Sequence, residues 1–153
     1  MNESQALALM VAPAGNRPSK PYLGGVIQVL VTSSCDKACY GCTQNSQLAR
    51  PKWFMTPEQF EQAILSLKDY WGVHGVFGGN PCLSPHFKDY CEILRKHVPF
   101  PQRGLWSNNP ITLENAQECA RTFHPGHSNL NVHMDQKAFD LFKQGCLSAT
   151  PWD

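Results

Sequence analysis

Three cysteines at short intervals are the residues of this sequence best suited to chemistry. Cys35, Cys39 and Cys42 form a C-x-x-x-C-x-x-C pattern. Gaps of three and two residues let one short loop bring three thiolates to neighbouring corners of a cuboidal iron–sulfur cluster. Soft sulfur ligands also suit zinc, and they disfavour magnesium and calcium. The spacing therefore predicts a metal-binding loop, with an iron–sulfur cluster as the first choice.

Three other interpretations of the cysteines remain open. Zinc would need a fourth ligand, for which Cys82 or a histidine could be recruited. Cys39 and Cys42 alone form a dithiol of the kind used in redox exchange, although this leaves Cys35 without a role. The three cysteines could also be a small apolar stripe on a helix. The serines and threonine before them and the glycine within the pattern argue against a helix.

The cysteine pattern resembles the signature of the radical S-adenosylmethionine (radical SAM) superfamily. The resemblance implies that Cys35, Cys39 and Cys42 hold three irons of a [4Fe–4S] cluster. It also implies that the fourth iron binds the amino and carboxylate groups of S-adenosylmethionine. Tyr40 matches the aromatic position that lies beside the adenine in this family. The expected cofactors are therefore a [4Fe–4S] cluster and S-adenosyl-L-methionine.

A second segment resembles a motif of the same family. Gly78-Gly79-Asn80-Pro81 is similar to the G-G-E-P segment that receives the methionine amino group. Glycines let a backbone approach a ligand closely, although the same four residues could form an ordinary turn. Asn80 stands where the family has Glu, so the side chain keeps a carbonyl acceptor and lacks the negative charge.

Polar residues at later strand ends form a weaker set of candidates. Ser107 and Asn108 end a predicted strand, and the resemblance implies cofactor binding by them. Asn131, His133 and Asp135 lie on or after the next strand. For each of these five residues a cap or turn role competes, most strongly for Asp135. No residue is assigned as catalytic.

Alternating strand and helix patterns supply the elements that would position these residues. Apolar runs predict strands at 26–31, 73–77, 104–107 and 130–134, the first of them buried on both faces. Capping residues and apolar periodicity predict four helices, which open at Thr56, Ser84, Thr112 and Asp135, the first ending at Gly72 and the last near Gly145. Four βα units imply an α/β fold with a parallel sheet, whose functional groups gather at the carboxyl ends of the strands.

The strand and helix pattern alone does not separate a barrel-like sheet from a doubly wound one. The family resemblance implies a partial (βα) barrel of the radical SAM type. Residues 1–23, rich in proline, are predicted to be an N-terminal arm, and residues 24–153 a radical SAM-like βα core. Because the family core has six units and only four are counted here, we expect an incomplete, N-terminal part of that core. Exposed strand edges would then favour self-association or a partner chain that completes the barrel.

Composition narrows the possible function classes. The chain has 153 residues, a net charge of +1 and seven cysteines. The near-zero charge gives no argument for a nucleic-acid or anionic-membrane partner. No secretory signal is evident, and no apolar stretch reaches the roughly 18–20 residues of a membrane helix. Free thiols and a metal loop indicate a reducing, cytoplasmic location.

The expected function is that of a radical SAM enzyme or a fragment of one. By resemblance, such a protein cleaves S-adenosylmethionine reductively to a 5′-deoxyadenosyl radical, which abstracts hydrogen from a substrate. A flavodoxin or ferredoxin would supply the electron, and the sequence does not select the substrate. The alternative is a non-catalytic zinc- or iron–sulfur-binding module.

Overall fold

Four parallel strands alternate with four α-helices in the computed structural model, which describes residues 25–131 and 135–149. The strands are β1 (Val26–Leu30), β2 (Val73–Phe77), β3 (Arg103–Ser107) and β4 (Asn129–Leu130). The helices are α2 (Pro57–Ser66), α3 (Phe87–His97), α4 (Leu113–Thr122) and α5 (Gln136–Ser148). The predicted α/β fold with a parallel sheet is confirmed, and the predicted arm lies outside the described residues.

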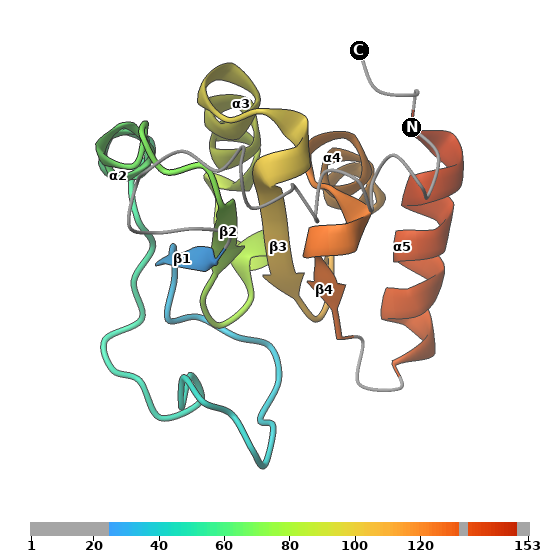
Figure 1. The fold of residues 1–153 in the computed structure, drawn as a ribbon. Helices are drawn as coiled ribbons and strands as arrows, with labels where there is room; N and C mark the ends of the chain where they lie inside the picture. The colour runs from blue at the N-terminus through green and yellow to red at the C-terminus, as the bar shows by residue number, and fades with distance from the viewer. Residues whose placement is uncertain (1–24, 132–134, 150–153) are drawn as a thin grey trace.

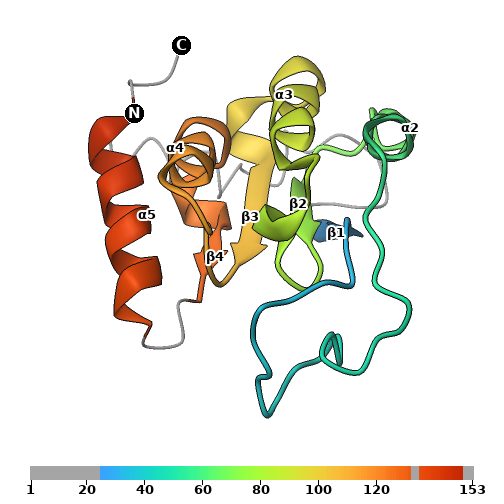
Figure 2. The ribbon, with the colours of Figure 1, turned by 180° about the vertical axis from the view of Figure 1, so that it is seen from behind.

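The strands follow one another across the sheet in chain order, β1-β2-β3-β4. The four helices lie on one face of the sheet, each packed against the next along the chain (Figures 1 and 2). A doubly wound sheet would need a reversal of strand order and helices on both faces. The described sheet is therefore singly wound. The loop that follows β1 extends from the edge at which β3 and β4 end (Figure 1).

Three of the predicted helix caps are present. The Thr56 hydroxyl accepts from the backbone N–H of Gln59, whose side chain accepts from the backbone N–H of Thr56 in return. The side chains of Thr112 and Asp135 each accept from a backbone N–H three residues further on. Such caps satisfy N–H groups that the first helical turn leaves without a partner. The second helix differs: it begins at Phe87, three residues after the predicted start, and has no side-chain cap.

The core lies between the sheet and the helices. The predicted apolar faces of the helices supply most of it, and Phe60 of α2 packs on Tyr90 of α3 with ring centroids 4.8 Å apart. The buried members of the core are Val31, Phe60, Ile64, Val76, Cys82, Phe87, Tyr90, Cys91, Leu94, Val98, Leu105, Cys119, Phe123 and Phe142. None of the described helices is long and apolar enough to cross a membrane.

β1 is not buried on both faces, which corrects one sequence prediction. Its burial alternates, and Val26 and Leu30 are 47 % and 40 % exposed. Within the described residues β1 pairs only with β2, and no described helix covers the face on which these two side chains lie. Within the described residues, the β-branched run therefore belongs to an edge strand with one packed face.

Two glycines predicted to end helices have a different role. α2 ends at Ser66, before Gly72, and a Cβ on Gly72 would lie 2.3 Å from the Tyr70 hydroxyl. α5 continues past Gly145, where a Cβ would lie 2.5 Å from the Cβ of Ala116 on α4. Both glycines are required by a close approach of neighbouring groups. Strand β4 begins at Asn129, and residues 132–134 of its predicted range lie outside the described residues.

We expect stability to fall on mild acidification because of a buried histidine. His74 on β2 is 3 % exposed, and this burial lowers its pKa below the ordinary value of 6.5. The unfolded chain then binds a proton at a higher pH than the folded chain, so stability is complete above about pH 6.5 and declines below it. One such group contributes at most ~1.4 kcal/mol per pH unit. Urea unfolding at pH 7.5 and 5.5 measures the decline, and His74→Leu should reduce it. An unchanged decline in the variant would assign it to other groups.

Candidate functional site

The three cysteines line one cavity at the carboxyl ends of the strands. Cys35, Cys39 and Cys42 lie in the loop that leaves β1, and they face a cavity of about 210 Å³. Four other predicted site residues line the same cavity, namely Gly78, Gly79, Ser107 and Asn108. Residues from three separate parts of the chain therefore meet at the edge of the sheet where the sequence places them.

Backbone hydrogen bonds join the cysteine loop to the glycine segment. The N–H of Gly79 donates to Thr32 O at 3.0 Å, and the N–H of Asn80 donates to Ser34 O at 2.7 Å. Gly78 has φ +142°, a conformation that residues with a side chain rarely adopt. A Cβ on Gly79 would lie 2.1 Å from Ser34 O. Both glycines are therefore needed for the loop to lie directly on this segment.

Two charged side chains hold the first part of the cysteine loop. Asp36 accepts hydrogen bonds from the side-chain amides of Asn80 and Asn109, both at 2.9 Å. Lys37 forms an ion pair of 2.6 Å with Asp135, the residue that caps α5. This ion pair raises the pKa of Lys37 and lowers the pKa of Asp135. The residues next to Cys35 are thus tied to β2, β3 and α5.

The Asn80 side chain is fully buried and does not line the cavity. Its amide nitrogen donates to Asp36 and to the backbone carbonyl of Asn109. Its carbonyl oxygen accepts from the N–H of Cys82 and from the hydroxyl of Ser107. All four hydrogen-bonding positions of a side-chain amide are used. Asn80 thus links the glycine segment to the cysteine loop and to the end of β3.

Two other predicted site residues lie away from the cavity. The side chain of Tyr40 is fully exposed on the cysteine loop. Pro81 is buried as the first residue of the short 3-10 helix Pro81–Leu83. Neither lines the cavity. The described geometry therefore gives the aromatic side chain no contact with the space between the cysteines.

The thiols of the cysteine loop differ in their surroundings. Burial raises the pKa of Cys35, while hydrogen bonds from backbone N–H groups, that of Ser46 first, lower the pKa of Cys42. Among the described residues, no three His, Cys, Asp or Glu side chains form a metal-binding set. The three thiols thus line one cavity, but they are not arranged as a set of metal ligands.

The donor chemistry of the cavity still suits a soft metal centre. Its described lining has three thiols and no carboxylate or imidazole group. Asn108 is 6 % exposed, and its side-chain carbonyl oxygen has no hydrogen-bond partner, while its amide nitrogen lies 3.8 Å from the Cys35 sulfur. Such a buried acceptor beside a cavity is a place for a ligand's N–H or O–H group. The residues present therefore fit the expected cluster and a polar ligand beside it.

Several residues that line the cavity were not among the predicted site residues. Phe77 ends β2, Trp106 lies near the end of β3, and Asn129 begins β4. The others are Gly41, Thr43 and Gln44, whereas Asn131, which also lines the cavity, had been one of the weaker candidates. The signal that could have found Phe77 and Trp106 is strand alternation, since each is the last side chain on the helix-free face before its strand ends. His133 lies outside the described residues.

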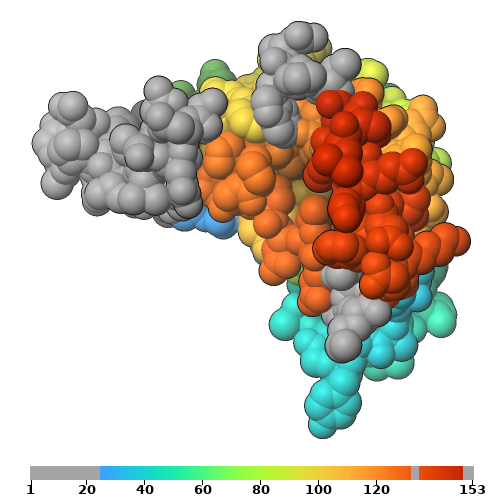
Figure 3. Space-filling model, turned by 90° about the vertical axis from the view of Figure 1, so that its right-hand side faces the viewer, coloured from blue at the N-terminus to red at the C-terminus, as the bar shows by residue number. Residues whose placement is uncertain are grey.

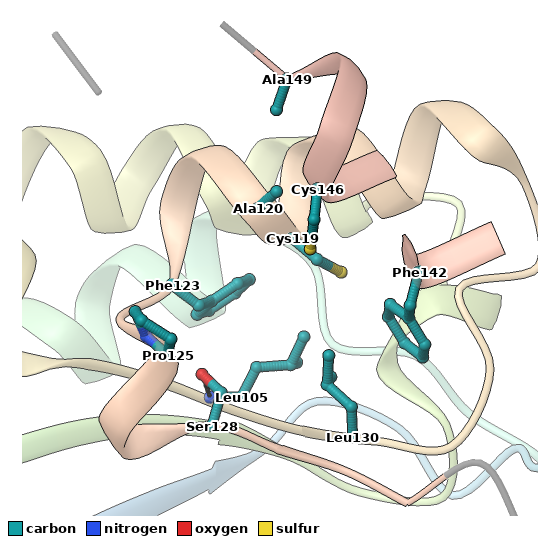
Figure 4. A pocket seen from close by; sticks show the side chains of 10 residues that line it. All are labelled: Leu105, Cys119, Ala120, Phe123, Pro125, Ser128, Leu130, Phe142, Cys146 and Ala149. Atoms are coloured by element: carbon teal, nitrogen blue, oxygen red, sulfur yellow. Dashed lines mark hydrogen bonds between the residues drawn. The ribbon is translucent and has the colours of Figure 1, made fainter. Parts of the chain in front are cut away.

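A larger cavity of about 340 Å³ lies on the helix side of the sheet, between α4, α5 and the strands. Figure 4 shows that its walls are mostly apolar side chains, with Leu105 and Leu130 from the sheet and Phe142 from α5. Its one hydroxyl, on Ser128, is already bonded to backbone groups of Leu105 and His124. This cavity offers little for chemistry. Cys82, considered above as a zinc ligand, lines neither cavity.

Replacing Asn80 by Asp should destabilise the protein. The new carboxylate would face Asp36 and the Asn109 carbonyl, two acceptors that now receive hydrogen bonds from the Asn80 amide. Asp36 is exposed and can bind water instead, so the cost comes from the buried carboxylate at position 80, and we expect a loss of about 1–3 kcal/mol in the free energy of unfolding. Urea denaturation at pH 7.5 measures it.

The added variant Asp36→Asn provides the control for this prediction. In the double variant, an amide at position 36 can again donate to a carboxylate at position 80. The double variant should therefore be more stable than Asn80→Asp alone. Equal stabilities would mean that the contact between positions 36 and 80 contributes nothing.

A scan against protein-family models found no match, and neither the curated proteins nor the solved structures searched contain a match to this chain.

Proposed function

We propose that this chain is a radical SAM protein that holds a [4Fe–4S] cluster on Cys35, Cys39 and Cys42. The observation that carries the proposal is the backbone pairing of Gly79 and Asn80 with the cysteine loop. This pairing supports the proposal because the glycine segment and the three thiols then line one cavity, which is what the two sequence motifs together imply. The consecutive strand order, with all described helices on one face, supports a partial (βα) barrel as the finer fold.

Each residue of the site then has a specific part in binding. The three cysteines hold the irons, and Gly78 and Gly79 offer backbone groups to S-adenosylmethionine. Asn80 positions the glycine segment through Asp36. Ser107 and Asn108 close the far wall of the cavity, where the unpartnered Asn108 carbonyl oxygen accepts a ligand's N–H or O–H group.

A [4Fe–4S] cluster held by Cys35, Cys39 and Cys42 would supply the electron for reductive cleavage of S-adenosylmethionine, the chemistry that would allow hydrogen abstraction from a substrate. The proposed electron donor is a flavodoxin or ferredoxin. The protein's own contribution is to hold the cofactor and to exclude water.

Loading of the metal must complete the arrangement of the thiols. Metal binding and local folding are coupled, because the thiolates reach their final arrangement only when the metal binds. Cys35 lies beside Asp36 and Lys37, which are tied to Asn80, Asn109 and Asp135. Cys39 and Cys42 follow in turn structure, with the N–H of Cys42 bonded to Cys39 O at 3.3 Å. We therefore expect Cys39 and Cys42 to move towards Cys35 on loading.

A metal-binding module without catalytic activity is the second candidate. Two observations favour it, namely the exposure of Tyr40 and the complete use of the Asn80 side chain inside the protein. The two functions differ in whether the bound metal has an iron open to S-adenosylmethionine.

Removal of any one cysteine of the loop should abolish the cluster. Anaerobic reconstitution with iron and sulfide should give the visible absorption and the reduced-state EPR signal of a [4Fe–4S] cluster. Cys35→Ala, Cys39→Ala and Cys42→Ala should each lose both signals, because each removes a corner thiolate. Cys91→Ala and Cys119→Ala are matched controls in the buried core, and they should keep both signals.

S-adenosylmethionine then separates the two candidate functions. Its addition should change the EPR signal of the reduced cluster, and 5′-deoxyadenosine should accumulate under dithionite. A cluster whose EPR signal does not change on addition of S-adenosylmethionine would favour the non-catalytic module. A chain that takes up zinc and no cluster would contradict the proposed function.

A further inference from the structure

The chemistry that the larger cavity offers is that of two thiols. Cys119 of α4 and Cys146 of α5 both line it, among apolar side chains and the hydrogen-bonded hydroxyl of Ser128. Figure 4 shows the Cys146 side chain pointing from α5 towards Cys119, with both sulfur atoms in the same part of the cavity. Thiols that meet in this way from two helices can be joined by a disulfide bond.

The backbones of α4 and α5 approach closely beside these two residues. A Cβ on Gly145 would lie 2.5 Å from the Cβ of Ala116 and 2.6 Å from its carbonyl carbon. Cys146 follows Gly145 directly, and Cys119 lies about one helical turn after Ala116. Packed helices usually have axes roughly 8–10 Å apart, whereas a disulfide needs Cα atoms about 4.4–6.8 Å apart. The small residues at positions 116 and 145 therefore allow the approach that a disulfide between these helices requires.

The two thiols differ in their access to solvent. Cys146 is exposed, whereas Cys119 is 6 % exposed. Burial, together with a hydrogen bond to the Cys82 thiol, raises the pKa of Cys119 well above the ordinary value of 9.0, so Cys119 stays protonated at neutral pH. Because exposed thiols react with oxidants much faster than buried ones, a dissolved oxidant attacks Cys146 first. Cys119 lies in the same part of the cavity and can then react with the oxidised sulfur.

We propose that Cys119 and Cys146 form a reversible disulfide, which joins α4 to α5 when the protein meets hydrogen peroxide. The Cys146 thiolate attacks one peroxide oxygen and the O–O bond breaks, which gives a sulfenic acid at Cys146 and a hydroxide that takes up the thiol proton. The Cys119 sulfur then attacks the sulfenic sulfur, the S–O bond breaks, and the departing hydroxide leaves as water with the Cys119 proton. In total the two thiols lose two electrons, and the peroxide is reduced to two molecules of water. A small dithiol reverses the change by thiol–disulfide exchange and is itself oxidised.

The disulfide restrains the helix that anchors the cysteine loop. α5 follows its cap Asp135, whose ion pair with Lys37 holds the residues next to Cys35. Cys146 lies near the other end of the same helix. When α5 is joined to α4 at that end, it separates from the sheet less readily, and Asp135 keeps its position beside Lys37. The bond itself involves no residue of the proposed cluster site.

Cys82 is the competing partner of Cys119. Its thiol is hydrogen-bonded to Cys119, but Cys82 is 3 % exposed and lies outside the cavity lining. A dissolved oxidant therefore reaches neither member of this pair directly. A disulfide between them would also disturb the contact between the Cys82 thiol and the Ser107 hydroxyl. We therefore expect Cys82 to stay reduced.

Peptide mapping without reduction tests the pairing. The metal-free full-length chain is treated with hydrogen peroxide, its free thiols are alkylated in denaturant, and the monomer is digested with trypsin. Cleavage after Arg and Lys gives residues 104–121 and 144–153, each with one cysteine, so a linked pair of these two peptides identifies the bond between Cys119 and Cys146. We expect this linked pair, and dithiothreitol should remove it. In Cys146→Ser the pair should be absent, while the matched control Cys91→Ser should keep it.

Gly145→Ala tests the approach of the helices with both thiols left in place. The added Cβ would meet the Ala116 backbone, so we expect the disulfide to form several-fold more slowly. Circular dichroism checks that the variant remains folded. Thermal unfolding measures the restraint on α5: peroxide should raise the melting temperature by about 5–10 °C relative to the same treatment of Cys146→Ser, and dithiothreitol should reverse the rise.

Three results would each overturn the proposal. They are a disulfide between Cys82 and Cys119, a link between two copies of the chain through Cys146, and a sulfinic acid at Cys146 without any link. Iron uptake is measured separately on the same chain. A chain that joins Cys119 to Cys146 but takes up no cluster would uphold this inference and reject the proposed function. A chain that loads a cluster but never joins these two cysteines would do the reverse.

Discussion

The site depends on the contact between the cysteine loop and the residues that follow β2. β1 and β2 pair through their full length, and the pairing continues past both strands to Asn80 and Ser34. This extension fixes where the loop leaves the sheet. It is possible only because Gly78 has a positive φ and Gly79 has no Cβ to meet Ser34 O. The position of Cys35 beside this segment follows from the same pairing.

The side chain of Asn80 adds the polar part of this contact. In the family that the sequence resembles, a glutamate follows the two glycines, whereas here an amide does. The buried amide can donate to Asp36 while it accepts from Cys82 and Ser107. A carboxylate can only accept, so it could not replace the bond to Asp36. The negative charge in this part of the molecule is therefore on Asp36 of the cysteine loop. Asn80 is thus better understood as a structural link between the loop and the sheet than as a ligand.

Much of the fold could be predicted because it is determined locally. Thr56 and Thr112 cap their helices as predicted, and Phe87, Tyr90 and Leu94 lie on a buried face because helical periodicity requires it. Seven of the ten predicted site residues share one cavity, since the carboxyl ends of parallel strands meet at one edge.

Features that depend on contacts between residues far apart in the sequence could not be predicted from the sequence. Gly145 lies inside α5 because Ala116 of another helix is close, and nothing near Gly145 in the sequence indicates this. The exposure of Val26 follows from the place of β1 in the sheet, which its residue types do not reveal. Tyr40 is separated from the cavity by the path of the loop rather than by its spacing from the cysteines.

The two faces of the sheet satisfy different requirements, and the glycines in β2 and β3 show how. The face towards the helices carries Val76 and Leu105, which are fully buried. The opposite face carries Gly75 and Gly104 at positions where side chains would usually strengthen a strand. Glycine within a strand weakens it, since it has no side chain to pack and loses more conformational entropy on folding. The Trp106 ring, lying over both glycines, restores part of the missing packing and closes that end of the cavity. The helix-covered face thus provides the buried apolar packing, while on the cavity face the Trp106 ring packs over the two glycines.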